Sequence, residues 1–431
     1  MPLNSKQELI DLEQVFDDLW PICRSLTGDG VRESLDIIEK WMPLTRTSVP
    51  SGSSVYDWSV PKEWNIRDAY IITPNGEKIA QFKKNNLHVL NYSTPVNMKI
   101  GFTELKKHLY TLKNQPDAIP YVTSYYKEKW GFCISENQLA QLPQEGEYHV
   151  YIDSTLENGE LIYAEGVLTG SSKKEVLIST YICHPSMANN ELSGPLAAIF
   201  LYRRLAQIPN RRLTYRFLFA PETIGVIAFL SKTGEHLKQN LEAGYVLTCC
   251  GDRGELTYKE SKRIDSKADQ MAKHILSSSN KKHNIIPFAV GGSDERQYCS
   301  PGFNLPVGSL MRTPYQKYNE YHTSLDNKDF ISFDHLQETI ECYEMICKGL
   351  DMDLCYKGKI QHCEPQLGKR GLYPDSVKPE DSRTLLHRLL HLLSYADGKT
   401  PLLDIAKLRN ESIIDYQETV SKCLEVNMLS E

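Results

Sequence analysis

The sequence predicts an α/β fold, in which a mainly parallel sheet is flanked by helices, together with an inserted β-rich domain and a small helical domain at the C-terminus. Apolar runs of buried-strand length, such as VLISTYI at residues 176–182 and TYRFLFA at 214–220, alternate with stretches of helical periodicity. Short strand-like runs between Pro, Gly and Asn turns fill an earlier part of the chain. A length of 431 residues also requires more than one hydrophobic core.

Composition is typical of packed, soluble domains. Hydrophobic residues make up 41% of the chain and charged residues 24%. No apolar run approaches the roughly 20 residues that span a bilayer, and the polar N-terminus lacks the features of a secretory signal. Eleven cysteines show no CxxC spacing, so we expect reduced thiols rather than a disulfide framework. These observations predict a cytoplasmic protein with no membrane role.

Changes of pattern along the chain divide it into domains. Apolar residues at helical spacing near the N-terminus, and the later alternation of strands and helices, assign residues 1–44 and 160–355 to one discontinuous α/β domain. Residues 45–159 form the β-rich insert. The insert has no sequence cluster of His, Cys or paired carboxylates, so we expect it to shape access to a site, contact a partner or mediate oligomerisation.

A stretch rich in Pro, Gly and charge after Cys363 indicates a linker, and three apolar stripes then predict a winged-helix-like domain over residues 366–431. Helix-turn-helix units bind DNA, but the charges of this one are nearly balanced. The whole chain has a net charge of −6 and gives no overall field for capturing nucleic acid. Nucleic-acid binding therefore stays an alternative to protein docking that the charge does not favour.

Polar residues at the ends of the predicted strands are the candidates for chemistry. His184 follows the run VLISTYI, Glu222 follows FLFAP, Asp252 follows LTCCG, and His322 lies in a turn-like segment. Ligands of α/β folds collect beyond the carboxyl ends of the strands, where these four side chains are expected. Imidazole and carboxylate groups are the ligand types that divalent metals accept. The pattern therefore predicts a metal site at this edge of the sheet.

Two further segments are expected at the mouth of the same site. Asp294 and Glu295 follow the apolar run IIPFAV, and Arg312 follows GSLM. Either carboxylate would suit a substrate amino group, and the guanidinium would suit a carboxylate or another anion. Solvated loop charges are the alternative interpretation of all three residues.

The ordered segments resemble the co-catalytic zinc aminopeptidases, metallopeptidases of clan MH. That family typically reads Asp-Asn-x-Ser-Gly, then Glu-Glu-x-Gly, and last Tyr/His-His-Thr with an Asp a few residues later. Here the segments read Asn190-Glu191-Leu192-Ser193-Gly194, Glu222-Thr223-Ile224-Gly225 and Tyr321-His322-Thr323-Ser324-Leu325-Asp326. The resemblance covers the first helices and about residues 160–350, and it is closest to a bacterial branch with a domain inserted near the N-terminus and a winged helix at the end.

The resemblance implies that His184 and Asp252 hold one metal, that His322 holds the second, and that Glu222 is the general base. Each imidazole or carboxylate is identified only by its place in the matching segment. The expected fold is the zinc-aminopeptidase α/β fold, and the expected cofactor is zinc.

Two positions depart from the family pattern. The bridging aspartate falls on Asn190, a neutral amide that binds zinc poorly, and the second-metal glutamate falls on Thr223. Glu191 would supply a carboxylate only if the loop shifted by one residue. One zinc ion is therefore expected rather than two, with Asn190 as a weak ligand.

The sequence thus predicts a metal-dependent hydrolase, an aminopeptidase or amidohydrolase that attacks a small peptide, amino-acyl or amide substrate with metal-activated water. Two alternatives remain open. In the first, the fold is a non-catalytic binding or scaffold protein, because two ligand positions are lost. In the second, the chain is a DNA-binding regulator that acts through its C-terminal domain.

Overall fold

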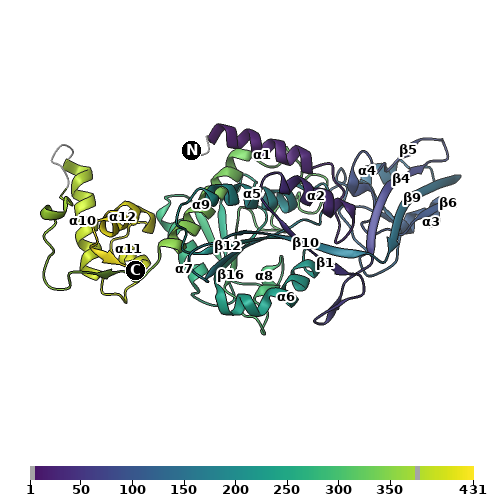
Figure 1. Ribbon diagram of the computed structural model, residues 1–431. Helices are drawn as coiled ribbons and strands as arrows, with labels where there is room; N and C mark the ends of the chain where they lie inside the picture. Colours follow the sequence, from purple (N-terminus) through teal and green to yellow (C-terminus); the bar gives the residue numbers. More distant parts are fainter. Residues whose placement is uncertain (1–4, 374–378) are drawn as a thin grey trace.

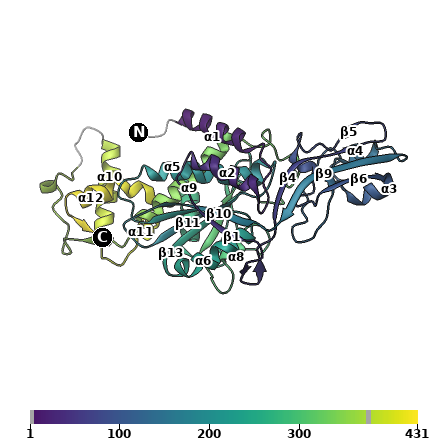
Figure 2. The ribbon, with the colours of Figure 1, turned by 45° about the vertical axis from the view of Figure 1, so that its right-hand side comes forward.

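The computed structural model describes residues 5–373 and 379–431. An α/β domain occupies the middle of an elongated molecule (Figure 1). The β-rich part of the chain lies at one end and the C-terminal helices at the other, and a second view shows the same arrangement (Figure 2). The candidate site residues lie in the middle domain.

A central sheet of eight strands organises the α/β domain. In spatial order the strands are β1 (Thr45–Pro50), β10 (Glu160–Leu168), β12 (Thr214–Ala220), β11 (Glu175–Tyr181), β13 (Leu241–Leu247), β16 (Val307–Met311), β14 (Leu256–Lys259) and β15 (His283–Ile286). Neighbours from β12 to β16 are parallel, whereas β10 pairs antiparallel with both β1 and β12, and β14 pairs antiparallel with β16. The predicted α/β architecture is confirmed, as a mixed sheet with a parallel centre.

Helices cover both faces of this sheet (Figure 1). One core contains side chains of α1 (Ser5–Leu19), α2 (Asp29–Glu39), α5 (Ser193–Ala206), α7 (Lys267–Ser278) and α9 (Phe333–Met352). The other core contains side chains of α6 (Ile224–Asn240) and α8 (Glu295–Tyr298). Strand β11 is buried along its whole length because Val176 and Ile178 enter the first core while Leu177 enters the second. The site therefore lies at the end of a strand that is packed on both faces.

The β-rich part has its own sheet and its own core. Its four strands run in the spatial order β5 (Lys78–Ile79), β4 (Glu63–Ile72), β9 (Glu147–Glu157) and β6 (Val96–Gly101). Short elements surround this sheet, namely β2 (Ser54–Val55), β3 (Trp58–Ser59), α3 (Phe102–Leu105), β7 (Leu109–Tyr110), β8 (Phe132–Cys133) and α4 (Glu136–Ala140). The predicted insert begins at residue 45, but β1 pairs with β10 and so belongs to the central sheet.

Three helices form the C-terminal unit, α10 (Pro379–Tyr395), α11 (Leu402–Leu408) and α12 (Gln417–Glu425). Strand β17 (Lys357–Gly358) pairs antiparallel with β18 (Leu429–Ser430), which ties a segment upstream of residue 366 to this unit. Part of the predicted linker, residues 374–378, lies outside the described residues. The three helices and the β17–β18 pair agree with the predicted winged-helix-like unit.

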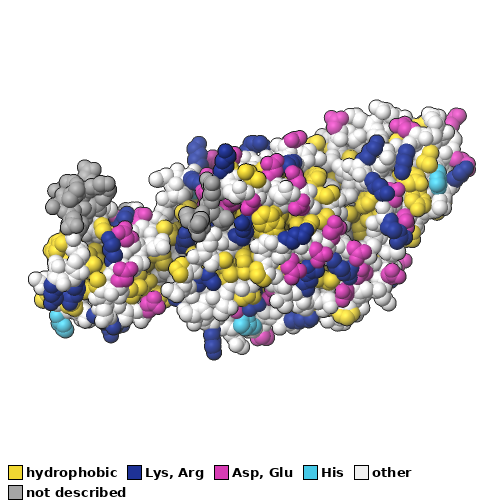
Figure 3. Space-filling view, turned by 45° about the horizontal axis from the view of Figure 1, so that its top comes forward, with side chains coloured by type: hydrophobic (Ala, Val, Ile, Leu, Met, Phe, Trp, Pro, Cys, Tyr) yellow, Lys and Arg dark blue, Asp and Glu magenta, His cyan; other side chains and the backbone are white. Residues whose placement is uncertain are grey.

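Charges of both signs are interspersed over the face that is shown in Figure 3. Among the described residues, no helix combines the length and the apolar character needed to cross a membrane.

Ile178 tests the packing of the central strand. The side chain is fully buried, so Ile178→Ala is expected to lower the free energy of unfolding by about 2–5 kcal/mol. Ile264 is 92% exposed, and Ile264→Ala is expected to stay within about 0.5 kcal/mol of the parent protein. Urea denaturation of both variants makes the comparison, and equal losses would contradict the described core.

Candidate functional site

The site lies where the chain leaves the carboxyl ends of neighbouring parallel strands. His184 follows β11 and Glu222 follows β12, and these two strands are paired in parallel. A π-helical turn, Ala188–Leu192, then leads into α5. Such one-turn π segments widen a helix locally and occur often at functional sites. The predicted meeting of strand ends therefore brings His184 and Glu222 together.

His184 is held between two carboxylates. Its Nδ1 lies 2.8 Å from Oε2 of Glu191, and its Nε2 lies 3.6 Å from Oε2 of Glu222. An ionised carboxylate only accepts hydrogen bonds, so the bond to Glu191 places a proton on Nδ1. This leaves Nε2 directed at Glu222. A histidine whose second nitrogen is fixed by a carboxylate is a typical arrangement of a metal ligand.

Arg24 compensates the buried charge of Glu191. Both side chains are almost completely buried, and Arg24 Nε lies 3.7 Å from Oε1 of Glu191. The guanidinium also donates to the main-chain oxygens of His184 and Leu19, at 3.2 and 2.7 Å. Burial lowers the pKa of Arg24, and the charge of Glu191 opposes this shift. Sequence reasoning missed Arg24, because only the fold brings it to residues about 160 positions away.

The surroundings of His184 favour a positive charge on the ring. Burial lowers its pKa, but the hydrogen bond with Glu191 and the charges of Glu191 and Glu222 outweigh burial, so the pKa is raised overall. His322 behaves in the opposite way: burial and the neighbouring His184 lower its pKa to about 3, so it is neutral. The surroundings therefore favour the protonated form of His184 and disfavour the protonated form of His322.

His322 lies next to His184, with the ring centroids 5.4 Å apart. Its backbone is in the left-handed region, with a φ of 55°. The buried Nε2 of His322 has no hydrogen-bond partner within residues 5–373 and 379–431. The end of this turn is fixed to the π-helical turn, because Asp326 accepts hydrogen bonds from the amides of Asn189 and Asn190 at 2.6 and 2.9 Å. The open nitrogen therefore sits on an anchored loop.

Asn190 presents an open oxygen. Its Nδ2 donates to the hydroxyl of Tyr181 at 3.0 Å, which directs Oδ1 away from that bond. The buried Oδ1 has no hydrogen-bond partner in the described chain. Glu191, the next residue, points to His184 instead, so the π-helical turn gives the two side chains separate roles.

Glu222 and Asp294 form an acidic pair. Burial raises the pKa of Glu222, with His184 opposing the shift. Asp294 accepts a hydrogen bond from the amide of Thr223 at 2.8 Å, and its Oδ2 is buried without a partner among the described residues. Burial and the charge of Glu222 raise the pKa of Asp294 well above its usual range. A cation arriving beside these groups would stabilise both carboxylates.

Asp252 is occupied by the protein itself. Its Oδ1 accepts from Gly254 N and from the hydroxyl of Thr313, both at 2.7 Å. Its Oδ2 accepts from Asn189 Nδ2 at 2.9 Å and from Thr313 N at 3.0 Å. Four donors leave no oxygen directed at an open space. Asp252 therefore acts in this structure as a link between the loops that follow β13 and β16.

Glu295 and Arg312 are both buried within networks. Glu295 Oε1 accepts from Lys259 Nζ at 2.6 Å and from the hydroxyl of Tyr315 at 2.8 Å. Arg312 donates to the main-chain oxygens of Gly254 and His335, at 2.9 and 2.8 Å. It is also paired with Glu338. These contacts occupy Arg312 and one oxygen of Glu295, whereas Oε2 of Glu295, like Oδ2 of Asp294, is buried without a partner among the described residues.

Cys183, His184 and Glu191 place one potential ligand atom each within 4.8 Å of one another. Burial raises the pKa of the Cys183 thiol well above its usual range, which disfavours the thiolate that binds metals. The atoms of His184 and Glu191 that face each other already share a hydrogen bond. This trio is therefore a poor metal set.

Other atoms near His184 are open instead. His184 Nε2 faces Glu222, and the buried His322 Nε2 and Asn190 Oδ1 have no hydrogen-bond partner in the described chain. Ligands of one tetrahedral zinc ion lie roughly 3.3 Å apart, and Glu222 Oε2 is 3.6 Å from His184 Nε2. A second ion would lack carboxylate ligands, because Thr223 has only a hydroxyl and both oxygens of Asp252 already accept hydrogen bonds.

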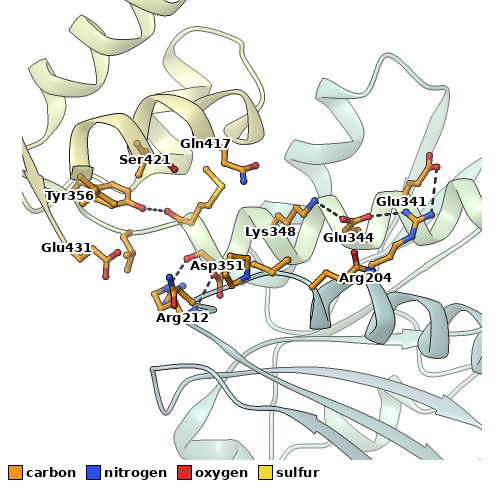
Figure 4. Close-up of a pocket in the computed structure, with 18 of the residues that line it drawn as sticks. Arg204, Arg212, Glu341, Glu344, Lys348, Asp351, Tyr356, Gln417, Ser421 and Glu431 are labelled. Carbon is orange, nitrogen blue, oxygen red and sulfur yellow. Dashed lines mark hydrogen bonds and ion pairs between the residues drawn. The ribbon is translucent and has the colours of Figure 1, made fainter. Parts of the chain in front are cut away.

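A cavity of about 840 Å³ lies between the α/β domain and the C-terminal unit (Figure 4). Its charged side chains are largely paired with one another. Arg204 donates to Glu344 at 2.9 Å, and Lys348 lies 2.6 Å from the same glutamate. Arg212 donates to the main-chain oxygen of Asp351 at 2.9 Å. We assign this cavity to the contact between domains, because residues of both the α/β domain and the C-terminal unit line it.

Asp252→Asn separates a structural link from a metal ligand. The substitution keeps the size of the side chain but places an amide group against four donors, so the free energy of unfolding should fall by about 1–3 kcal/mol. Zinc affinity, measured by calorimetry on the folded variant, should be unchanged. Loss of zinc binding with unchanged stability would instead make Asp252 a ligand, as the resemblance implies.

Two family models match the chain. A domain of unknown function, DUF4910, matches residues 13–353, and a winged helix-turn-helix model matches residues 355–431. Over 403 residues the chain is 44% identical to a protein of Clostridium acetobutylicum with the provisional name polysaccharide biosynthesis protein with aminopeptidase-like domain. That match covers 94% of this chain and 92% of the relative.

Solved structures agree with this assignment. A crystal structure from Clostridium acetobutylicum, of a provisionally assigned peptidase, superposes with a TM-score of 0.91 at 41% identity over 99% of this chain and 97% of that chain. A zinc aminopeptidase of Bacillus subtilis superposes with a TM-score of 0.58 at 12% identity, over 80% of this chain and 94% of its own, which shows a shared fold alone. The chain belongs to the DUF4910 family. Its DUF4910 domain has an aminopeptidase-like fold, and a winged helix-turn-helix domain follows it.

Proposed function

We propose that the chain is a hydrolase that uses one divalent metal ion to cleave an amide bond in a small amino-acyl or N-acylated substrate. The observation that carries the proposal is the convergence of His184, Glu222 and His322, with Nε2 of His184 directed at Glu222 and Nε2 of His322 buried without a partner in the described chain. Unsatisfied buried nitrogen and oxygen atoms are costly and require an explanation, which a bound ion supplies.

His184, His322 and Asn190 would hold the ion, through two nitrogens and one amide oxygen. When bound, a divalent ion supplies Lewis acidity, which polarises a carbonyl group and makes a water molecule acidic. The three protein ligands would be neutral in this role, so His184 would give up its Nε2 proton when the ion binds. Glu191 keeps the ring of His184 oriented by its hydrogen bond to Nδ1.

Glu222 is the proposed general base. Its carboxylate lies 3.6 Å from His184 Nε2, close enough to take a proton from water placed at the same position. Burial raises its pKa, which brings the group nearer to the pKa range of an efficient base and of the acid that later protonates the leaving amine. Asp294 offers its open Oδ2 to an amino group of the substrate.

The site and the named relative both support the proposed substrate class. An open carboxylate beside the base suits a free or developing amine, as in an amino-acyl amide. The relative is named for polysaccharide biosynthesis. We therefore include N-acylated amino sugars, which also contain an amide bond, among the proposed substrates. Both classes contain an amide that water attacks at the carbonyl carbon.

A second candidate is a binding protein without catalysis. It is favoured by Asn190 and Thr223 at positions where the zinc aminopeptidases carry carboxylates, and by the full occupation of Asp252. Metal content separates the two candidates directly.

The charges of the C-terminal unit do not favour DNA binding. Acidic side chains outnumber basic ones nine to six between residues 379 and 431. Lys407 is paired with Asp404, and Arg409 with Glu411. Proteins that bind nucleic acid typically present a basic face, so a protein partner is the better proposal for this unit.

Zinc content is the first test. Protein purified without chelator or affinity metal should contain close to one zinc per chain by mass spectrometry, and His184→Ala should contain little. His236 is partly exposed on α6, and His236→Ala serves as the control that should keep its zinc. Metal-free parent protein that also fails to bind added zinc would favour the binding-protein candidate.

Glu222→Gln tests the base. The variant should keep its zinc but lose about 10²- to 10⁴-fold in kcat, because an amide cannot accept the proton. Hydrolysis would be followed on amino-acyl amides and on N-acylated amino sugars. Glu235→Gln, at a side chain that is 77% exposed, is the matched control and should keep full activity. Equal activity in the two variants would contradict the assigned role.

A further inference from the structure

A segment of the β-rich insert reaches the loop that carries His322. Tyr121 N donates to the main-chain oxygen of His322 at 2.8 Å, and Ser324 N donates to the main-chain oxygen of Ile119 at 2.9 Å. Ile119 N donates to the hydroxyl of Ser324 at 3.0 Å. Pro120 and Thr323 form an antiparallel bridge between these hydrogen bonds. Two segments about 200 residues apart are thus paired like short strands.

The ring of Tyr121 fills the corner between the two histidines. Its centroid lies 5.2 Å from that of His184 and 5.2 Å from that of His322. The planes of Tyr121 and His322 are 88° apart, which is the edge-to-face arrangement that aromatic rings prefer. Since the histidine centroids are themselves 5.4 Å apart, the three rings form a compact triangle. Tyr121 limits how far either imidazole can turn.

Contacts within the insert hold Tyr121 in place. Its hydroxyl shares a hydrogen bond of 2.8 Å with the hydroxyl of Tyr125. Tyr125 in turn packs edge-to-face on Tyr92, with the centroids 5.6 Å apart, and Tyr92 is almost fully buried. The hydroxyl of Tyr92 donates to the main-chain oxygen of Lys62 at 2.8 Å. The insert therefore sets the position of the Tyr121 ring.

We propose that the insert is a working part of the site, with Tyr121 as the positioning residue that sets His322 relative to His184. Main-chain pairing fixes the loop, and the ring fixes the angle between the imidazoles. The metal-binding consequence rests on the proposed function, whereas the positioning of the His322 loop does not.

Hydrogen exchange on the metal-free, full-length protein tests the positioning. Tyr121→Ala should increase amide exchange in peptides that cover residues 319–326 by about tenfold, because the loop loses the Tyr121 ring and opens locally more often. Tyr121→Phe keeps the ring and should exchange like the parent protein. Tyr126→Ala is the matched control, since Tyr126 is an exposed neighbour on the same segment. Unchanged exchange in Tyr121→Ala would overturn the proposal.

Zinc titration by calorimetry, with the same variants, tests the consequence. Tyr121→Ala should bind zinc about 10- to 100-fold more weakly, while Tyr121→Phe and Tyr126→Ala should match the parent protein. Parent protein that binds no zinc would end the proposed function and leave the exchange result to decide this inference. If Tyr121→Ala does not fold, Ser324→Ala replaces it, because that variant removes only the hydroxyl that accepts from Ile119 N. Equal zinc affinity in all folded variants that bind zinc would show that the insert does not position His322.

Discussion

The buried hydrogen bond between Glu191 and His184 is the interaction on which the candidate site depends. A carboxylate with no exposed surface is costly unless it is paired, and here it is paired with an imidazole and a nearby guanidinium. Removing one partner of such a buried pair typically costs about 3–5 kcal/mol. Because Glu191 holds Nδ1 of His184, the other ring nitrogen faces Glu222. The same bond thus stabilises the fold and determines which nitrogen of His184 faces the proposed base.

One π-helical turn directs three neighbouring side chains to the end of β11, to the segment that follows it and to the loop after β13. Asn189 donates to Asp252, Asn190 donates to Tyr181, and Glu191 binds His184. Asp326 accepts from two amides of the same turn and so connects it to the loop of His322. Small displacements of this turn would therefore reach every part of the site. The insert adds a second constraint from the opposite side, through Tyr121.

Much of the architecture was predictable, because apolar runs and helical periodicity report burial directly. His184 and Glu222 were predicted to meet because both follow runs of parallel-strand type, and β11 and β12 are indeed adjacent. Strand direction was less predictable: an apolar run such as that of β10 does not reveal that it runs antiparallel to its neighbours. The sheet is therefore more mixed than its sequence suggests.

The remaining site residues depend on contacts between distant segments. Asp252 follows a strand as expected, yet Thr313 saturates it because β13 and β16 are neighbours. Arg24 and Tyr121 carry no local motif, and they reach the site only through the packing of the first helices and of the insert. Glu191 was visible beside Asn190, but its direction is set by the π-helical turn, which periodicity does not indicate.

The position of zinc in crystals, located by anomalous diffraction at the zinc absorption edge, tests the proposed metal site directly. We expect one peak about 2.0–2.2 Å from Nε2 of His184 and within bonding distance of His322 Nε2, with Nδ1 of His184 still bound to Glu191. A peak on the Cys183 thiol or on Asp252, or crystals that take up no zinc at this position, would contradict it.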